Sequence, residues 1–309
     1  MQAHQAILKK EAALNPDRLF IALQYMLPQH GLSRLVGQLA SSPWSICKTP
    51  LIRWFVRHYQ VNMEEAAHSR LEDYACFNDF FTRALSAGVR PIAAAPTHLA
   101  CPADGVLSQF GQIEEGHLFQ AKGSTYDVGE LLANDALAKS FRHGHFATVY
   151  LAPRDYHRVH MPLDGTLSDM LYVPGRLFSV NLVTAKYVPR LFARNERVVA
   201  VFHTPYGKMA LVLIGAMIVA GIETVWAGHV TLRSGHMQHT CYSHTDAVVL
   251  RKGDEMGRFK MGSTVVMLLA NPALRWQHHI ASGMSVRMGQ TLATFSGSHP
   301  DVVRPLHGE

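Results

Sequence analysis

Three short polar segments of the chain carry residues that could perform chemistry. The first holds Asp104 in a turn framed by proline and glycine. The second holds His157 and His160 between two prolines, and the third holds Ser263 between a glycine and an apolar run. A histidine that removes a hydroxyl proton, with a carboxylate that orients the histidine, activates a serine nucleophile. The segments therefore contain the parts of a nucleophilic serine site, although spacing alone does not bring them together.

Each of these segments also has an ordinary structural interpretation. Asp104 could bond its own backbone in a turn, and the two histidines could be interior polar groups. The Gly-Ser-Thr sequence around Ser263 could simply lead into a strand, and it occurs a second time around Ser124. The tripeptide is therefore a weak signal by itself, and these alternatives stay open on the residues alone.

The 19 histidines of the chain raise the question of a metal site. Two close pairs are His143 with His145 and His278 with His279. Neither pair has cysteine or carboxylate neighbours at the spacing that zinc sites use. The sequence therefore predicts no metal site, and surface or hydrogen-bonded histidines instead.

The composition is that of a globular protein. The 309 residues are 48% hydrophobic and 17% charged, which is far from the signature of disorder. The four cysteines lie far apart without a CxxC pair, and no signal peptide opens the chain, so we expect a reduced cytosolic setting. The longest apolar run, Met209 to Ile222, is shorter than the ~20 residues that cross a bilayer, and it predicts buried strands.

Two regions of the chain must position these residues. The first region, about a hundred residues long, has helical periodicity. Thr49 followed by Pro50 predicts the N-cap and first position of the third of three helices. The apolar faces of the three expected helices are Leu19, Leu23, Met26 and Leu27; Leu32, Leu35, Val36 and Leu39; and Leu51, Ile52, Phe55 and Val56.

This helical region is also basic. Residues 1–60 contain seven lysines and arginines and two acidic residues, a net charge of +5 out of +6 for the whole chain. A basic segment attracts phosphate, so its partner is nucleic acid or an anionic membrane surface. Basic amphipathic helices can lie on a membrane surface or pack on the rest of the protein, and periodicity leaves both uses open.

The second region, from Leu99 onward, has short β-rich runs separated by glycine. The clearest runs are 146–151, 198–203, 208–219 and 264–269. Two prolines near residues 90–96 mark the boundary between the helical region and the β-rich region. We therefore predict an α+β fold with a helical, membrane-associating region over 1–95 and a β-rich catalytic domain over 96–309.

The three polar segments resemble those of the bacterial, pyruvoyl-dependent phosphatidylserine decarboxylase family. That family has Leu-Gly-Ser-Thr at its cleavage site, where this chain has Met261-Gly-Ser-Thr, a volume-conserving difference. The resemblance extends from about Leu23 to Leu292, and residues 295–309 match nothing in it. The other matching segments begin at Tyr156 (Tyr-His-Arg-Val-His), Phe77, Lys122, Tyr172, Leu177, Phe192, Ile222 and Lys252.

The resemblance implies a self-cleaving enzyme. It implies cleavage between Gly262 and Ser263 into a β chain (1–262) and an α chain (263–309), with Ser263 converted to a covalent pyruvoyl group. It assigns self-cleavage to a charge relay of Asp104, His160 and Ser263, with Asp155 as a supporting carboxylate. It assigns His157 to decarboxylation, and it places Ser124 in the family's own Lys-Gly-x-x-Tyr segment and not at the cleavage site.

The resemblance also implies the partners. The substrate is phosphatidylserine, which reacts through a Schiff base with the pyruvoyl group to give phosphatidylethanolamine and CO₂. We expect a peripheral enzyme on the cytoplasmic side of the cell membrane, bound to an anionic membrane surface and not to nucleic acid. We also expect the β and α chains to form a heterodimer that pairs into a dimer.

Two other interpretations compete. A serine hydrolase would use the same Asp104, His160 and Ser263 on an external ester and keep its chain intact. A membrane-binding module without enzymatic activity would account for the basic helices and leave the polar segments unexplained.

Overall fold

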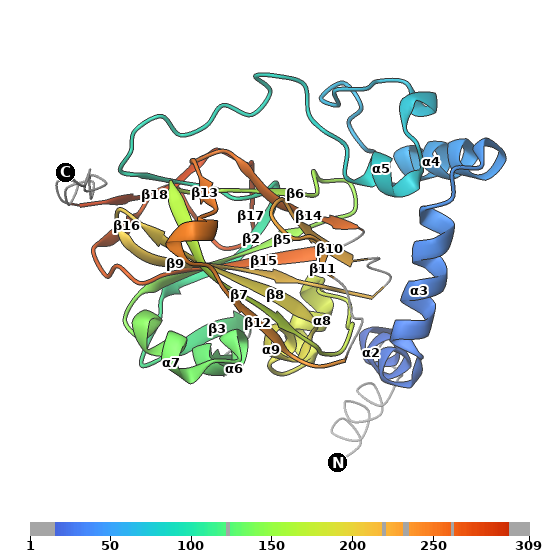
Figure 1. The fold of residues 1–309 in the computed structure, drawn as a ribbon. Coiled ribbons are helices and arrows are strands. Elements are labelled where there is room, and N and C mark those ends of the chain that lie inside the picture. Colours follow the sequence, from blue (N-terminus) through green and yellow to red (C-terminus); the bar gives the residue numbers. More distant parts are fainter. Residues whose placement is uncertain (1–15, 122–123, 218–220, 231–234, 261–262, 297–309) are drawn as a thin grey trace, which may run out of the picture.

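A twisted antiparallel β-sheet forms the body of the molecule, and a column of helices stands along one side of it (Figure 1). The computed structural model describes residues 16–121, 124–217, 221–230, 235–260 and 263–296. Helices concentrate toward the N-terminus and strands follow from residue 98, so the predicted α+β class is confirmed.

The main sheet has nine strands, and its centre is the strand that begins at Ser263. The spatial order is β12-β7-β8-β9-β15-β5-β2-β17, with β13 also paired to β7. All seven residues of β15 are buried, because β9 and β5 flank it and a hydrophobic cluster covers each face. The strands are β2 (Gly105–Gln112), β5 (His145–Leu151), β7 (Gly165–Val173), β8 (Arg197–Thr204), β9 (Gly207–Ile214), β12 (Gln238–Cys241), β13 (Val249–Leu250), β15 (Ser263–Leu269) and β17 (Met284–Val286).

Side chains of β15 alternate between the two clusters, as a strand's period of two requires. Val265, Met267 and Leu269 pack in one cluster, and Val266 and Leu268 pack in the other. Short helices cover the face that holds Val266 and Leu268. They are α6 (Val128–Leu132), α7 (Asp135–Ala138), α8 (Leu182–Tyr187) and α9 (Leu191–Arg194), with a 3₁₀ turn η2 (Lys139–Phe141).

Three smaller sheets accompany the main sheet among the residues that the structure describes. One of them matters for the site, because its strand β14 leads toward Ser263 and pairs with β6, the strand that carries His160. Its order is β11 (Gly228–Val230), β10 (Gly221–Thr224), β14 (Glu255–Lys260) and β6 (Arg158–His160). The others comprise β1 (His98–Ala100), β18 (Thr291–Phe295) and β16 (Leu274–Trp276), and the pair β3 (His117–Ala121) and β4 (Ser124–Asp127).

The N-terminal column contains α2 (Pro16–Met26), α3 (Gln29–Ala40), α4 (Ser45–Tyr59) and α5 (Phe77–Phe81), with the 3₁₀ turn η1 (Leu71–Asp73) beside them. Ile52 and Phe55 of α4 are buried in a cluster with the phenylalanines of α5. The apolar face of α4 therefore packs inside the protein. In the described part of the chain, no helix is long and apolar enough to cross a bilayer.

The predicted start of α4 is wrong by one turn. The helix begins at Ser45, and Pro50 lies inside it. The amides of Cys47 and Lys48 donate to the carbonyl of Trp44 at 3.0 and 2.9 Å, so backbone bonds start the helix without a capping side chain. The missing N–H of Pro50 removes one internal hydrogen bond, a loss that this 15-residue helix accommodates.

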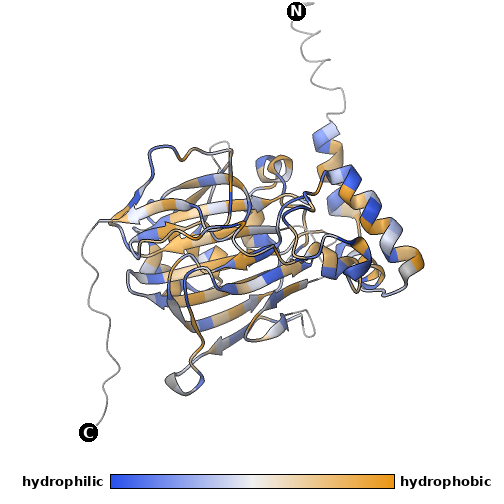
Figure 2. Ribbon diagram, turned by 90° about the horizontal axis from the view of Figure 1, so that it is seen from above, coloured by the Kyte–Doolittle hydropathy of each residue, from blue (hydrophilic) through white to orange (hydrophobic). Residues whose placement is uncertain are grey.

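Helices α2 and α3 turn polar side chains toward the body. Gln24 and Gln29 are buried, and their side-chain oxygens accept hydrogen bonds from the amides of Ser179 (2.7 Å) and Leu177 (2.8 Å). Ile21 of α2 is buried in a core cluster of the body, but most of the large apolar side chains of both helices are exposed, and Figure 2 shows hydrophobic residues on these helices beside the sheet body. The exposed ones are Leu19, Phe20, Leu23, Tyr25, Met26, Leu35 and Leu39.

Candidate active site

Ser263 lies at the beginning of the central strand and is fully buried. It pairs with Leu151 at the end of β5, and the loop after β5 carries the histidine segment. The Ser263 Oγ lies 3.4 Å from Nδ1 of His157. Met261 and Gly262, the rest of the predicted cleavage motif, lie outside the described residues.

The ring of His157 presents a lone pair to Ser263. Its Nε2 lies 3.0 Å from the carbonyl oxygen of Ala152 and donates to it, which leaves Nδ1 as the acceptor. Phe81 stacks on the ring with centroids 4.0 Å apart, so α5 forms one wall of the site. Burial, with the nearby charge of Arg83, lowers the pKa of His157 to about 3 and keeps the imidazole neutral.

Asp155 holds the loop that orients His157 without touching the imidazole. Its Oδ2 accepts a hydrogen bond of 2.7 Å from the amide of Ala152, the residue whose carbonyl bonds His157. Burial raises the pKa of Asp155. The carboxylate predicted as a support therefore acts on the backbone next to the histidine.

His160 has a separate set of partners. Its Nδ1 donates to the carbonyl of Gly253 at 2.8 Å, and the hydroxyl of Tyr156 donates to its Nε2 at 2.9 Å. Both nitrogens are thus engaged, and the structure gives no hydrogen bond between His160 and Ser263 within the described residues. Burial lowers the pKa of His160, and the charge of Arg158 adds to that shift, while the hydrogen bond to Gly253 and the charges of Glu255 and Asp104 oppose it. These carboxylates favour the protonated ring electrostatically.

Asp104 is paired with an arginine. Arg90 Nη2 donates to Asp104 Oδ2 at 2.6 Å and Nε lies 3.0 Å from Oδ1, while the amide of Met288 also donates to Oδ1 at 2.8 Å. Hydrogen bonding to Asp104 raises the pKa of Arg90. The predicted relay of Asp104, His160 and Ser263 is therefore not joined by hydrogen bonds among the described residues, because Arg90 and Tyr156 occupy the required positions.

Arg83 is a site residue that the sequence reasoning missed. It is 4% exposed, and its Nη2 donates to the backbone carbonyls of Arg154 (3.1 Å) and Asp155 (3.3 Å). Its Nε and Nη1 have no hydrogen-bond partner within the described residues. Arg83 lines a cavity of about 210 Å³ with Asp104 and Asp155. One signal in the sequence could have identified Arg83. It follows closely after Phe77–Phe81, a segment that matches the family.

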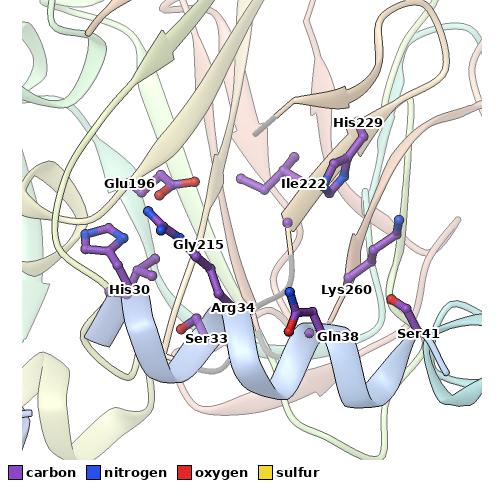
Figure 3. Close-up of a pocket in the computed structure, with 13 residues that line it drawn as sticks. His30, Ser33, Arg34, Gln38, Ser41, Glu196, Gly215, Ile222, His229 and Lys260 are labelled. Carbon is purple, nitrogen blue, oxygen red and sulfur yellow. The ribbon is translucent and has the colours of Figure 1, made fainter. Parts of the chain in front are cut away.

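A larger cavity, of about 430 Å³, lies between α3 and the ends of β9, β10 and β14 (Figure 3). Gly215, which lines it, follows the β9 residue that pairs with Thr264, so the cavity adjoins the start of β15. Arg34 points into it from α3, and Lys260 from the strand that leads to Ser263. Burial raises the pKa of Glu196, which also lines the cavity, to about 7, and its Oε2 has no hydrogen-bond partner among the described residues.

These contacts suit a cofactor made from the serine itself. A pyruvoyl group at position 263 would occupy a fully buried strand end beside a neutral histidine, and Thr264 next to it is also fully buried. Ser124, in contrast, begins β4 in a two-stranded sheet with β3. The geometry therefore distinguishes the two Gly-Ser-Thr sequences.

Comparisons with known proteins identify the family of the chain. A family model described as phosphatidylserine decarboxylase matches residues 77–294, and a model described as PSD matches residues 19–60. A phosphatidylserine decarboxylase proenzyme of Vibrio cholerae serotype O1 is 56% identical over 284 residues, which cover 90% of this chain and 99% of the relative. The proenzyme of Shewanella sp. (strain ANA-3) is 55% identical over 282 residues, 90% of this chain and 97% of that one. The proenzyme of Vibrio vulnificus (strain YJ016) is 53% identical over 284 residues, which cover 90% of this chain and 99% of the relative.

Proposed function

This chain belongs to the phosphatidylserine decarboxylase family, and we propose that Ser263 is both the point of cleavage and the origin of its pyruvoyl cofactor. The chain is a phosphatidylserine decarboxylase that matures from a proenzyme into two chains. The observation that carries the proposal is the buried pair of Ser263 Oγ and His157 Nδ1 at the start of the central strand.

Cleavage is an intramolecular acyl transfer. Ser263 Oγ attacks the carbonyl carbon of Gly262, the C–N bond between the two residues breaks, and an ester forms. Elimination then breaks the bond between Cβ and the ester oxygen, which releases the carboxyl end of the β chain and leaves dehydroalanine. Water converts this group to pyruvoyl and ammonia. The serine hydroxyl is a weak nucleophile without a base, so a histidine must take its proton.

Two histidines are candidates for that base. His157 is nearer, but a proton on its ring would lie buried beside the charge of Arg83. His160 is better placed to hold a proton than His157, because the Gly253 carbonyl and the charges of Glu255 and Asp104 oppose the lowering of its pKa by burial and by Arg158. We therefore retain His160 as the cleavage base, which requires its Nε2 to exchange the Tyr156 hydroxyl for Ser263. His157 is the alternative, favoured by distance.

In the mature enzyme the pyruvoyl group supplies a ketone that condenses with the substrate's primary amine and accepts electrons as CO₂ leaves. His157 Nδ1 faces position 263 and is placed to hold or move a proton there. Phe81 and the burial of position 263 keep water away. Decarboxylation is therefore assigned to His157.

The helices supply access to a substrate that stays in the bilayer. The outward leucines of α2 and α3 would enter the membrane surface while the inward glutamines hold the helices on the body. Arg34 in the adjoining cavity offers positive charge to the lipid phosphate, whereas Lys260, which also lines the cavity, is paired with Glu223. The protein would thus be a peripheral protein of an anionic membrane surface, and its αβ units are expected to pair into a dimer.

The mass of the purified protein tests the cleavage. We expect two chains, residues 1–262 and residues 263–309, with the smaller one blocked to Edman sequencing by pyruvoyl. Ser263→Ala should remain one inactive chain, while the matched control Ser124→Ala should cleave normally. An uncut wild-type chain that reacts with a fluorophosphonate would instead establish the serine hydrolase.

A further inference from the structure

A second cluster of chemically active side chains lies at the edge of the main sheet, away from Ser263. Its members are Asp169 on β7 and His239 and Cys241 on β12. Cys241 pairs with Asp169 across the two antiparallel strands, and His239 is two residues from Cys241 on the same face. Two strands, β8 and β9, separate β7 from β15, so the cluster lies at least ~14 Å from the central strand.

Three donor atoms of different types converge in this cluster. His239 Nε2 lies 2.9 Å from Asp169 Oδ1, and Cys241 Sγ lies 3.6 Å from Nε2 and 3.7 Å from Oδ1. A cysteine-histidine-aspartate relay would need the thiol and the carboxylate on opposite ring nitrogens. Here both meet the same nitrogen, so the arrangement is wrong for a nucleophilic triad.

Converging sulfur, nitrogen and oxygen donors are instead the ligands of a thiophilic divalent metal. Zinc bonds of ~2.0–2.3 Å in a tetrahedron place its donor atoms roughly 3.3–3.8 Å apart, a range that contains both distances from Cys241 Sγ, while the hydrogen-bonded pair of His239 and Asp169, at 2.9 Å, would have to separate slightly to admit the metal. The hydroxyl of Ser168 donates to the other carboxylate oxygen, Asp169 Oδ2, at 2.8 Å, which leaves Oδ1 for a metal. The site is accessible, because Cys241 is exposed and His239 is 34% exposed.

We propose that Asp169, His239 and Cys241 bind one Zn²⁺ ion, with water in the fourth position. The metal would join β12 to its only sheet neighbour within the described residues, β7. Cys241 would bind as the thiolate, so binding releases its proton. The site is independent of the serine chemistry, and failure of either proposal leaves the other standing.

Cobalt titration of the full-length, chelator-treated protein tests the site. Co²⁺ bound by a thiolate produces a sulfur-to-metal charge-transfer absorption, which should saturate at one equivalent and disappear when Zn²⁺ is added. Cys241→Ser should abolish this absorption, and Asp169→Asn and His239→Ala should each weaken binding at least ~10-fold. The matched control is Cys47→Ser, which removes another exposed cysteine and should bind as the wild type does.

Thermal unfolding gives a second readout. Zn²⁺ should raise the unfolding temperature of the wild type and of Cys47→Ser, and leave Cys241→Ser unchanged. A charge-transfer absorption that survives Cys241→Ser, or one that is lost in Cys47→Ser, would overturn the proposal. So would wild-type protein that binds no Co²⁺ while its cysteines are shown to be reduced.

Discussion

Helices α2 and α3 bury mainly polar side chains, with Ile21 and Ala40 as the apolar ones, whereas the central strand β15 buries mainly apolar side chains. All seven residues of β15 are buried, and five of them are large and apolar. In α2 and α3, the buried side chains include Gln24, Gln29 and Ser33, while Leu35 and Leu39 are 57% and 64% exposed. The sheet is organised around its own core, whereas these helices are held by specific hydrogen bonds together with the packing of Ile21 and leave most of their large apolar side chains exposed.

This difference supports the proposal that the sheet positions the reacting serine and that the helices meet the membrane. Burial around β15 holds Ser263 rigidly beside His157 and away from water. The outward leucines contribute little to the folded protein alone, since apolar surface stabilises only when it leaves water. Their exposure makes sense if a lipid surface covers them. Helix α4 differs from α2 and α3, because its Ile52 and Phe55 are buried against α5 and are not available to a lipid surface.

The largest expected effect tests the chemistry that β15 positions. His160→Ala should leave one uncut chain, because the base with the more favourable electrostatic surroundings is gone. His157→Ala should still cut, yet decarboxylate ~10²- to 10⁴-fold more slowly, the usual cost of a missing acid-base group. Denaturing gels and CO₂ release measure both effects. His203→Ala, an exposed histidine on β8, is the control and should behave as wild type.

The reverse pattern would change the assignment. An uncut His157→Ala together with a processed His160→Ala would transfer the cleavage base to the histidine that already faces Ser263.

The second prediction compares the two regions by stability. In the uncut Ser263→Ala background, Leu268→Ala should lower the free energy of unfolding by about 2–5 kcal/mol, because it opens a cavity in a fully buried strand. Leu39→Ala should change it by less than about 0.5 kcal/mol, because this side chain is mostly exposed. Denaturant unfolding measures both. Equal losses would show that α3 uses its leucines as core.

The third prediction concerns Glu196, in the cavity where the two regions meet. Burial raises its pKa to about 7 from a normal value of 4.5, so the folded state holds a proton that the unfolded state releases. The stability of the wild type relative to Glu196→Gln should therefore fall as pH rises from 4.5 to about 7, by on the order of 2 kcal/mol. Unfolding of both proteins at several pH values, again in the uncut background, measures the difference. A pH-independent difference would mean that Glu196 ionises normally.

The smallest effect concerns the membrane. Leu35→Glu with Leu39→Glu should weaken binding to anionic vesicles by at least ~10-fold, since each change places charge on the surface proposed to enter the lipid. Vesicle sedimentation measures binding. Val225→Glu with Val249→Glu adds the same charge at exposed positions of the body and serves as the matched control. If both double variants lose binding equally, net charge and not the helix face accounts for the association.

Much of the architecture could be predicted from local patterns. Periodicity of 3.6 identified the N-terminal helices, and the apolar run after Ser263 identified a buried strand. The long matching segments identified the family. The start of α4 was misplaced because Thr-Pro is a common helix beginning, yet backbone bonds from Trp44 begin this helix earlier.

The sequence by itself determined the α+β class, the family and the candidate residues, because these depend on residue type and spacing along the chain. Only the tertiary structure decided which way the amphipathic helices face, which histidine meets Ser263, and that Arg90 pairs with Asp104. It also brought Asp169 to Cys241 from 72 residues away. Each of these depends on contacts between segments distant in sequence, which strand pairing and packing create and which no local pattern encodes.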